Sequence, residues 1–125
     1  MKILLIDDSP TDRKIIMHLL ERAKITNEVL IAGDGQEGLL TLRARHQEIC
    51  LVLLDWQMPN IDGLEFMRIS RKDPILAPIP IIMVTSARAE DQKEIAMLIN
   101  PNLAGYIVKP FNPELLLEKI RLYLK

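Results

Sequence analysis

The run Leu51-Val52-Leu53-Leu54 constrains the fold of this chain most, because four consecutive apolar residues end at a single carboxylate, Asp55. A strand with one solvated face alternates apolar and polar residues, whereas a continuous apolar run is typical of a strand that is covered on both faces. Strands of that kind belong to parallel sheets with helices on both sides, and ligands bind beyond the carboxyl ends of those strands. We therefore expect Asp55 at a binding edge, although an isolated Asp there is equally compatible with a helix cap or a solvated strand end.

Short apolar segments alternate with segments of helical periodicity along the rest of the chain. The expected strands are residues 3–6, 28–32, 51–54, 79–84 and 105–108. The first expected helix runs from Ser9 to about Lys24, and the second, marked by Leu39 and Leu42, ends near His46 or Gln47. The others are expected over 64–72, within 90–99, and from Asn112-Pro113 onward. This alternation predicts the α/β class, as a single doubly wound sheet of five parallel strands with five helices. Among such sheets we expect the flavodoxin-like strand order 2-1-3-4-5.

The first expected helix illustrates the local signals. It begins at Ser9-Pro10, a hydroxyl at the cap followed by proline at the first helical position, and Asp12 supplies a carboxylate in the first turn. Its apolar residues recur at helical spacing and predict the buried face. That face consists of Ile15, Ile16, Leu19, Leu20 and Ala23.

Length and composition limit the possible functions. The chain has 125 residues, of which 49% are hydrophobic, so one domain spanning 1–125 is expected. Sixteen basic and 17 acidic residues give a net charge of -1 without charged runs, so no electrostatic argument favours a nucleic acid or a membrane as partner. The only cysteine, Cys50, heads an apolar run and is expected to be a buried thiol. No run reaches the length of a signal-peptide core or a membrane span, so we expect a cytoplasmic protein.

Polar residues follow the expected strands at the points where they end. Asp7-Asp8, Asp55, Thr85 and Lys109 occupy these positions. In the expected topology they share one edge of the sheet, where carboxylates held close together repel one another and favour a divalent cation. Mg²⁺ suits such oxygen ligands, and zinc is disfavoured because the set contains no histidine or cysteine.

These residues, in this order and spacing, are typical of one family. Asp55 is followed by Met58-Pro59 and Asp62-Gly63, and Lys109 by Pro110-Phe111. With Asp7-Asp8 and Thr85, they make the whole chain resemble the receiver domains of two-component response regulators. Trp56 and Tyr106 are also similar to the residues of the chemotaxis receivers, which are stand-alone members of the family.

The resemblance implies a site and its partners. Asp55 would accept a phosphoryl group from a phosphohistidine on a sensor histidine kinase or a histidine phosphotransfer protein. Mg²⁺ would be bound directly by Asp8 and Asp55, largely through water by Asp7, and by the backbone carbonyl of Gln57. The chain would then be a signalling phosphoacceptor that assists its own phosphorylation and dephosphorylation, and not an enzyme in the usual sense.

The resemblance also implies how the signal is transmitted. Lys109 would neutralise one phosphoryl oxygen, and Thr85 would donate its hydroxyl to another. The movement of Thr85 would let the ring of Tyr106 turn inward and change the face formed by helix four, strand five and helix five, where a downstream protein target would bind. The Lys109-Pro110 peptide bond is expected to be cis. Without the surrounding motif, Tyr106 would be read as an ordinary strand aromatic.

Four questions stay open at this point. A flavin-binding electron carrier shares the sheet topology, but its phosphate loop should be rich in Ser, Thr and Gly, where this chain has Asp7-Asp8. A vestigial pseudo-receiver, acting only as a protein-interaction module, is the second alternative, although all five site residues are present. The chain is expected to be either a stand-alone receiver or a fragment of a longer regulator. For the lifetime of the phosphorylated form, the resemblance implies that the side chains of Gln57 and the small Ala87 flank the approach of the attacking water.

Overall fold

A single parallel sheet organises the computed structural model, which describes residues 1–86 and 90–124. The strands are β1 (Lys2–Ile6), β2 (Val29–Ala32), β3 (Ile49–Leu54), β4 (Ile81–Thr85) and β5 (Gly105–Val108). The helices are α1 (Pro10–Arg22), α2 (Gly35–Arg45), α3 (Gly63–Lys72), α4 (Glu90–Ile99) and α5 (Pro113–Arg121), with a short 3-10 turn at His46–Glu48. The strand order is β2-β1-β3-β4-β5 and every pairing is parallel, which confirms the predicted fold class.

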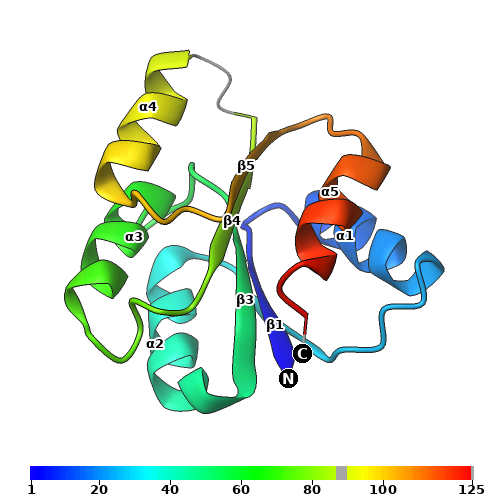
Figure 1. The fold of residues 1–125 in the computed structure, drawn as a ribbon, viewed down its shortest axis with the longest axis horizontal. Helices are drawn as coiled ribbons and strands as arrows, with labels where there is room; N and C mark the ends of the chain where they lie inside the picture. The colour runs from blue at the N-terminus through cyan, green and yellow to red at the C-terminus, as the bar shows by residue number, and fades with distance from the viewer. Residues whose placement is uncertain (87–89, 125) are drawn as a thin grey trace.

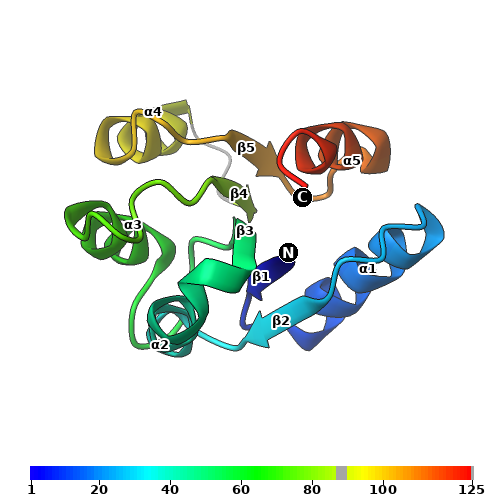
Figure 2. The ribbon, with the colours of Figure 1, turned by 60° about the horizontal axis from the view of Figure 1, so that its bottom comes forward.

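Helices cover both faces of the sheet. In Figures 1 and 2, α1 and α5 lie on one side, and α2, α3 and α4 lie on the other. Alternate residues of the central strands therefore enter two different cores: Leu4 of β1 packs with the α2–α4 side, and Ile3 packs with the α1–α5 side. All six residues of β3 are buried for the same reason. Each such side chain contributes about 1.5 to 3 kcal/mol to folding, so the continuous apolar runs fix both the sheet and its two helical layers.

Strand boundaries differ slightly from those expected from the sequence. Strand β3 begins two residues before Leu51, because Ile49 is paired with Lys2 of β1. Strand β4 begins at Ile81 and not at Ile79. Between them, Pro80 has no amide hydrogen to donate to a ladder, and only its carbonyl takes part, accepting a 2.9 Å hydrogen bond from the Val52 amide.

The predicted start of α1 is confirmed, but its predicted buried face is too wide. Ser9 Oγ accepts a 3.2 Å hydrogen bond from the Asp12 amide, which caps the helix as expected. Ile16 and Leu20 are buried, whereas Ile15 is 52% exposed, so including Ile15 in that face was wrong. Ile15 instead lines a hollow together with Phe111 and with Pro113, the first residue of α5. Within the two described ranges, no helix is long and apolar enough to cross a membrane.

Candidate functional site

Backbone hydrogen bonds at the carboxyl edge of the sheet hold the candidate residues. The Asp7 amide donates to the Ala32 carbonyl at 3.1 Å, and the Asp55 amide donates to the Ile6 carbonyl at 3.0 Å. The Lys109 amide donates to the carbonyl of Thr85 at 2.8 Å. Each of these bonds extends a strand ladder by one step, so Asp7, Asp55 and Lys109 emerge side by side, as predicted.

Three carboxylates come together at this edge. Oxygen atoms of Asp7, Asp8 and Asp55 all lie within 4.8 Å of one another. Asp7 and Asp55 are buried, with 1% and 9% of their surface exposed, whereas Asp8 is exposed. This set suits Mg²⁺, because the ligands are hard oxygen atoms and the exposed side leaves room for water ligands. The acidic pocket is thus compatible with magnesium binding and with phosphorylation of an aspartate.

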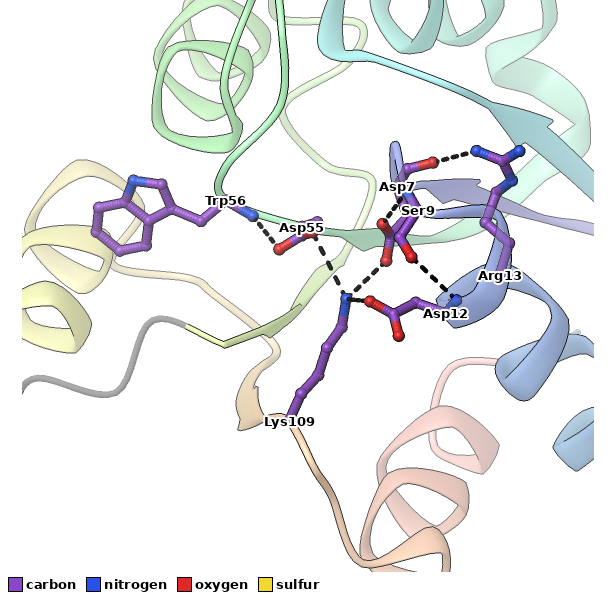
Figure 3. Close-up of polar contacts among 7 residues, drawn as sticks. All are labelled: Asp7, Ser9, Asp12, Arg13, Asp55, Trp56 and Lys109. Carbon is purple, nitrogen blue, oxygen red and sulfur yellow. Dashed lines mark hydrogen bonds and ion pairs between the residues drawn. The ribbon is translucent and has the colours of Figure 1, made fainter.

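Lys109 is the centre of the ion-pair network in Figure 3. Its Nζ lies 2.8 Å from Asp7 Oδ2, 2.9 Å from Asp12 Oδ2 and 3.5 Å from Asp55 Oδ2. Burial alone would lower the pKa of Lys109, but the hydrogen bonds to Asp7 and Asp12 and the charge of Asp55 raise it above its usual value. Lys109 is therefore a cation at neutral pH, placed beside the candidate acceptor.

The Asp7 carboxylate is held from two sides. Burial raises the pKa of Asp7, and the hydrogen bonds from Lys109 Nζ and from the Ser9 amide, at 2.8 and 2.9 Å, oppose that rise without cancelling it. The Arg13 guanidinium donates to the Asp7 carbonyl at 2.6 Å. Burial therefore still disfavours the Asp7 anion, which is the situation that a bound divalent cation relieves.

The β3–α3 loop shapes the wall beside Asp55. The Trp56 amide donates to Asp55 Oδ1 at 2.7 Å, and the Gly63 amide closes the loop by donating to the Trp56 carbonyl at 2.7 Å. Gln57 is exposed within this loop. That the backbone carbonyl of Gln57 binds a metal ion stays a prediction. Ala87, expected to flank the attacking water, lies outside the described residues.

The two candidate switch residues lie on neighbouring strands. Thr85 is the last residue of β4 and is fully buried, and Tyr106 is a half-buried residue of β5 that packs against the core on the α2–α4 side. Burial raises the pKa of the Tyr106 hydroxyl, and the charge of Asp55 raises it further. The role of Tyr106 as a switch residue stays a prediction. The Lys109-Pro110 bond is cis, as predicted.

One residue of this network was missed by sequence reasoning. Asp12 binds Lys109. In the sequence, however, its position in the first turn of α1 was already explained, because an acid there stabilises the start of a helix. The available signal was geometric: the loop after β1 is short, so the first turn of α1 must start beside the strand ends. His18 and His46, by contrast, lie on helix and turn positions and take no part in the network around Lys109.

Comparisons with known proteins agree with this geometry. The family model described as the response regulator receiver domain matches residues 3–121. The chain is 38% identical to the chemotaxis protein CheY of Pseudomonas aeruginosa over 96% of its own length and 93% of that protein. The chain is similar in structure to the chemotaxis protein CheY4 of Vibrio cholerae, with a TM-score of 0.83, 32% identity and 98% of both chains covered.

A further structural similarity concerns a phosphorylated protein. The phosphorylated cyanobacterial phytochrome response regulator RcpA has a TM-score of 0.81 to this chain and is 28% identical, with 96% of this chain and 88% of that chain covered. The sheet order, the acidic cluster, Lys109 and these similarities all lead to the same conclusion. The chain belongs to the family of response regulator receiver domains.

Proposed function

We propose that this chain, as one receiver domain spanning residues 1–125, carries signals by accepting a phosphoryl group on Asp55. The observation that carries the proposal is the placement of Asp55, whose carboxylate lies among two further carboxylates with Lys109 Nζ at 3.5 Å. A nucleophile for phosphoryl transfer needs positive charge close by, and most of such catalysis is positioning and charge neutralisation. The donor is a phosphohistidine on a sensor histidine kinase or a histidine phosphotransfer protein.

The transfer exchanges one bond for another. A carboxylate oxygen of Asp55 forms a bond to phosphorus while the bond from phosphorus to the donor histidine nitrogen breaks, and the electron pair of that bond stays on the imidazole. Lys109 offsets charge on the transferred group, because its ammonium lies 3.5 Å from the acceptor carboxylate. Thr85, at the end of β4, donates its hydroxyl to a phosphoryl oxygen. The Trp56 amide orients Asp55 through the 2.7 Å hydrogen bond to Oδ1.

The metal in this proposal is Mg²⁺. Asp8 and Asp55 would hold it directly, Asp7 largely through water, and the Gln57 carbonyl would complete the protein ligands. The close approach of the three carboxylates supports this assignment. When bound, Mg²⁺ supplies positive charge that offsets the phosphoryl oxygens. The domain assists its own phosphorylation and dephosphorylation, and it acts on no separate substrate.

The output is a change of surface. Thr85 and Tyr106 are the coupling pair, and the face that changes comprises α4, β5 and α5. Exposed apolar residues on α4, Ile95 at 41% and Leu98 at 79%, support a protein partner on that face. Two of the relatives named above, CheY and CheY4, are chemotaxis proteins, which further supports a protein target. A nucleic acid or membrane partner has no support in the charge distribution.

A labelling experiment tests the proposal. Incubation with acetyl phosphate and Mg²⁺ should add one phosphoryl group to the parent chain, as read by intact mass. Asp55→Asn should remove the addition, and the control Asp73→Asn, in the turn after α3, should leave it unchanged. A parent chain that takes up no phosphoryl group would instead favour the vestigial pseudo-receiver.

A further inference from the structure

The carboxylate of Asp12, in the first turn of α1, binds a residue outside its own helix. Asp12 is the third helical residue after the Ser9 cap, the position from which an acid can accept a hydrogen bond from the cap's own amide. Here the Ser9 amide donates to Asp7 Oδ1 instead, at 2.9 Å. The Asp12 carboxylate turns toward the site and accepts from Lys109 Nζ at 2.9 Å.

Asp12 competes with the acceptor for the lysine. Lys109 Nζ lies 2.9 Å from Asp12 Oδ2 and 3.5 Å from Asp55 Oδ2, so in this state the ammonium is closer to Asp12 than to the acceptor. The three carboxylates around Lys109 differ in exposure: the side chain of Asp12 is 35% exposed, against 2% for Asp7 and 11% for Asp55. Asp12 is thus the most exposed member of the set, and its contact with Lys109 is drawn in Figure 3.

The lysine has room to move. Asp12 and Lys109 line a hollow of about 540 Å³, whose other walls include Ile15 and Phe111. This explains why Ile15 is exposed despite its place in the apolar pattern of α1. The Lys109 ammonium can therefore exchange partners at the edge of this hollow without repacking the core.

We propose that Asp12 is a positioning residue that holds Lys109 away from Asp55 until a phosphoryl group or its mimic draws the ammonium inward. The inference rests on the proposed function, and it concerns the balance between the unphosphorylated and phosphorylated states. Asp12 lowers the affinity of the site for the anionic group. It also limits how far Lys109, which already lies 2.8 Å from Asp7, can move toward Asp55, and so favours the divalent cation.

Removing the charge of Asp12 should therefore move two affinities in opposite directions. In Asp12→Asn, the affinity for beryllium fluoride at saturating Mg²⁺ should rise about fivefold, the size expected for a partly exposed ion pair. The affinity for Mg²⁺ alone should fall, because Lys109 moves closer to Asp55 and competes with the cation for its carboxylate. A purely structural role of Asp12 in α1 would weaken both affinities or change neither.

Titrations followed by Trp56 fluorescence test the inference on the intact chain. Glu114→Gln, which removes an exposed charge from the first turn of α5, is the matched control and should change neither affinity. In a Lys109→Met background, Asp12→Asn should no longer weaken Mg²⁺ binding, because the lysine that transmits the effect is gone. If Asp12→Asn weakens Mg²⁺ binding by the same factor in that background, the inference is overturned, because the charge of Asp12 then acts on the cation directly and not through Lys109.

The outcomes separate this inference from the proposed function. If the parent chain binds Mg²⁺ and beryllium fluoride but Asp12→Asn shifts both in the same direction or neither, only the role of Asp12 is refuted. If the parent chain binds neither, the proposed function itself fails.

Discussion

Gly63, the first residue of α3, packs against the backbone of the acceptor itself, and adding one methyl group there should distort the site. A Cβ at Gly63 would lie 2.9 Å from Trp56 Cα and closer still to the Asp55 carbonyl oxygen. Both neighbours are backbone atoms, which cannot rotate away as a side chain does. The Trp56 carbonyl is also the acceptor of the 2.7 Å hydrogen bond from the Gly63 amide, so any shift strains that bond too.

The expected cost follows from this overlap. Gly63→Ala should destabilise the fold by about 2 kcal/mol, within the range for an extra carbon in a packed site. For a chain of this length that corresponds to a decrease of about 8 °C in the thermal midpoint. Because the strain is relieved by moving Asp55 and Trp56, the affinity for Mg²⁺ should also fall, and labelling by acetyl phosphate should slow.

Gly33→Ala is the matched control, because its new methyl group would meet only Glu37 Oε2, at 3.6 Å, which is ordinary contact. Thermal unfolding and Mg²⁺ titration of both variants give the comparison. The reasoning would be refuted if Gly63→Ala kept the stability and the Mg²⁺ affinity of the parent chain, or if Gly33→Ala lost as much of either.

Two further predictions concern other parts of the molecule. Thr85→Ala should still accept a phosphoryl group at Asp55 but should transmit less of the change, so beryllium fluoride should shift fewer amide resonances on α4, β5 and α5; shifts as extensive as those of the parent chain would argue against the coupling role of Thr85. Glu48 is hydrogen-bonded to Arg45 and Lys2, which lower its pKa from 4.5 to about 2, so its stabilising effect should be complete above the unfolded pKa and lost as the pH falls toward 2. Glu48→Gln should accordingly be less stable than the parent chain in urea at pH 7, with a difference that shrinks by pH 3, and a constant difference would contradict this sign.

Much of the fold could be predicted because its main determinant is local. The apolar runs at Ile3 to Ile6 and Leu51 to Leu54 are continuous since each strand feeds two cores, and that pattern is visible in the sequence. The start of β4 at Ile81 was harder to predict from the sequence, because Pro80 still joins the sheet through its carbonyl. The exposure of Ile15 depends on how α1 meets α5, which no local pattern specifies.

The candidate site was predicted to a similar extent. Asp7, Asp55 and Lys109 each follow a strand, so topology alone brings them together. Asp12 was missed because a first-turn acid already has a local role, and only the path of the chain after β1 turns it toward Lys109. The roles of Gln57 and Tyr106 depend on the phosphorylated state and stay predictions.

The central claim is that the residue which takes the phosphoryl group is Asp55, with Mg²⁺ bound beside it. The most direct test is to phosphorylate the parent chain, reduce the acyl phosphate with borohydride, and locate the modified residue by peptide mass spectrometry. We predict that the reduced residue is Asp55 and that chelation of Mg²⁺ by EDTA before the reaction abolishes the product. Modification elsewhere, for example a phosphoryl group on His18 or His46, or a yield that EDTA does not change, would contradict the account.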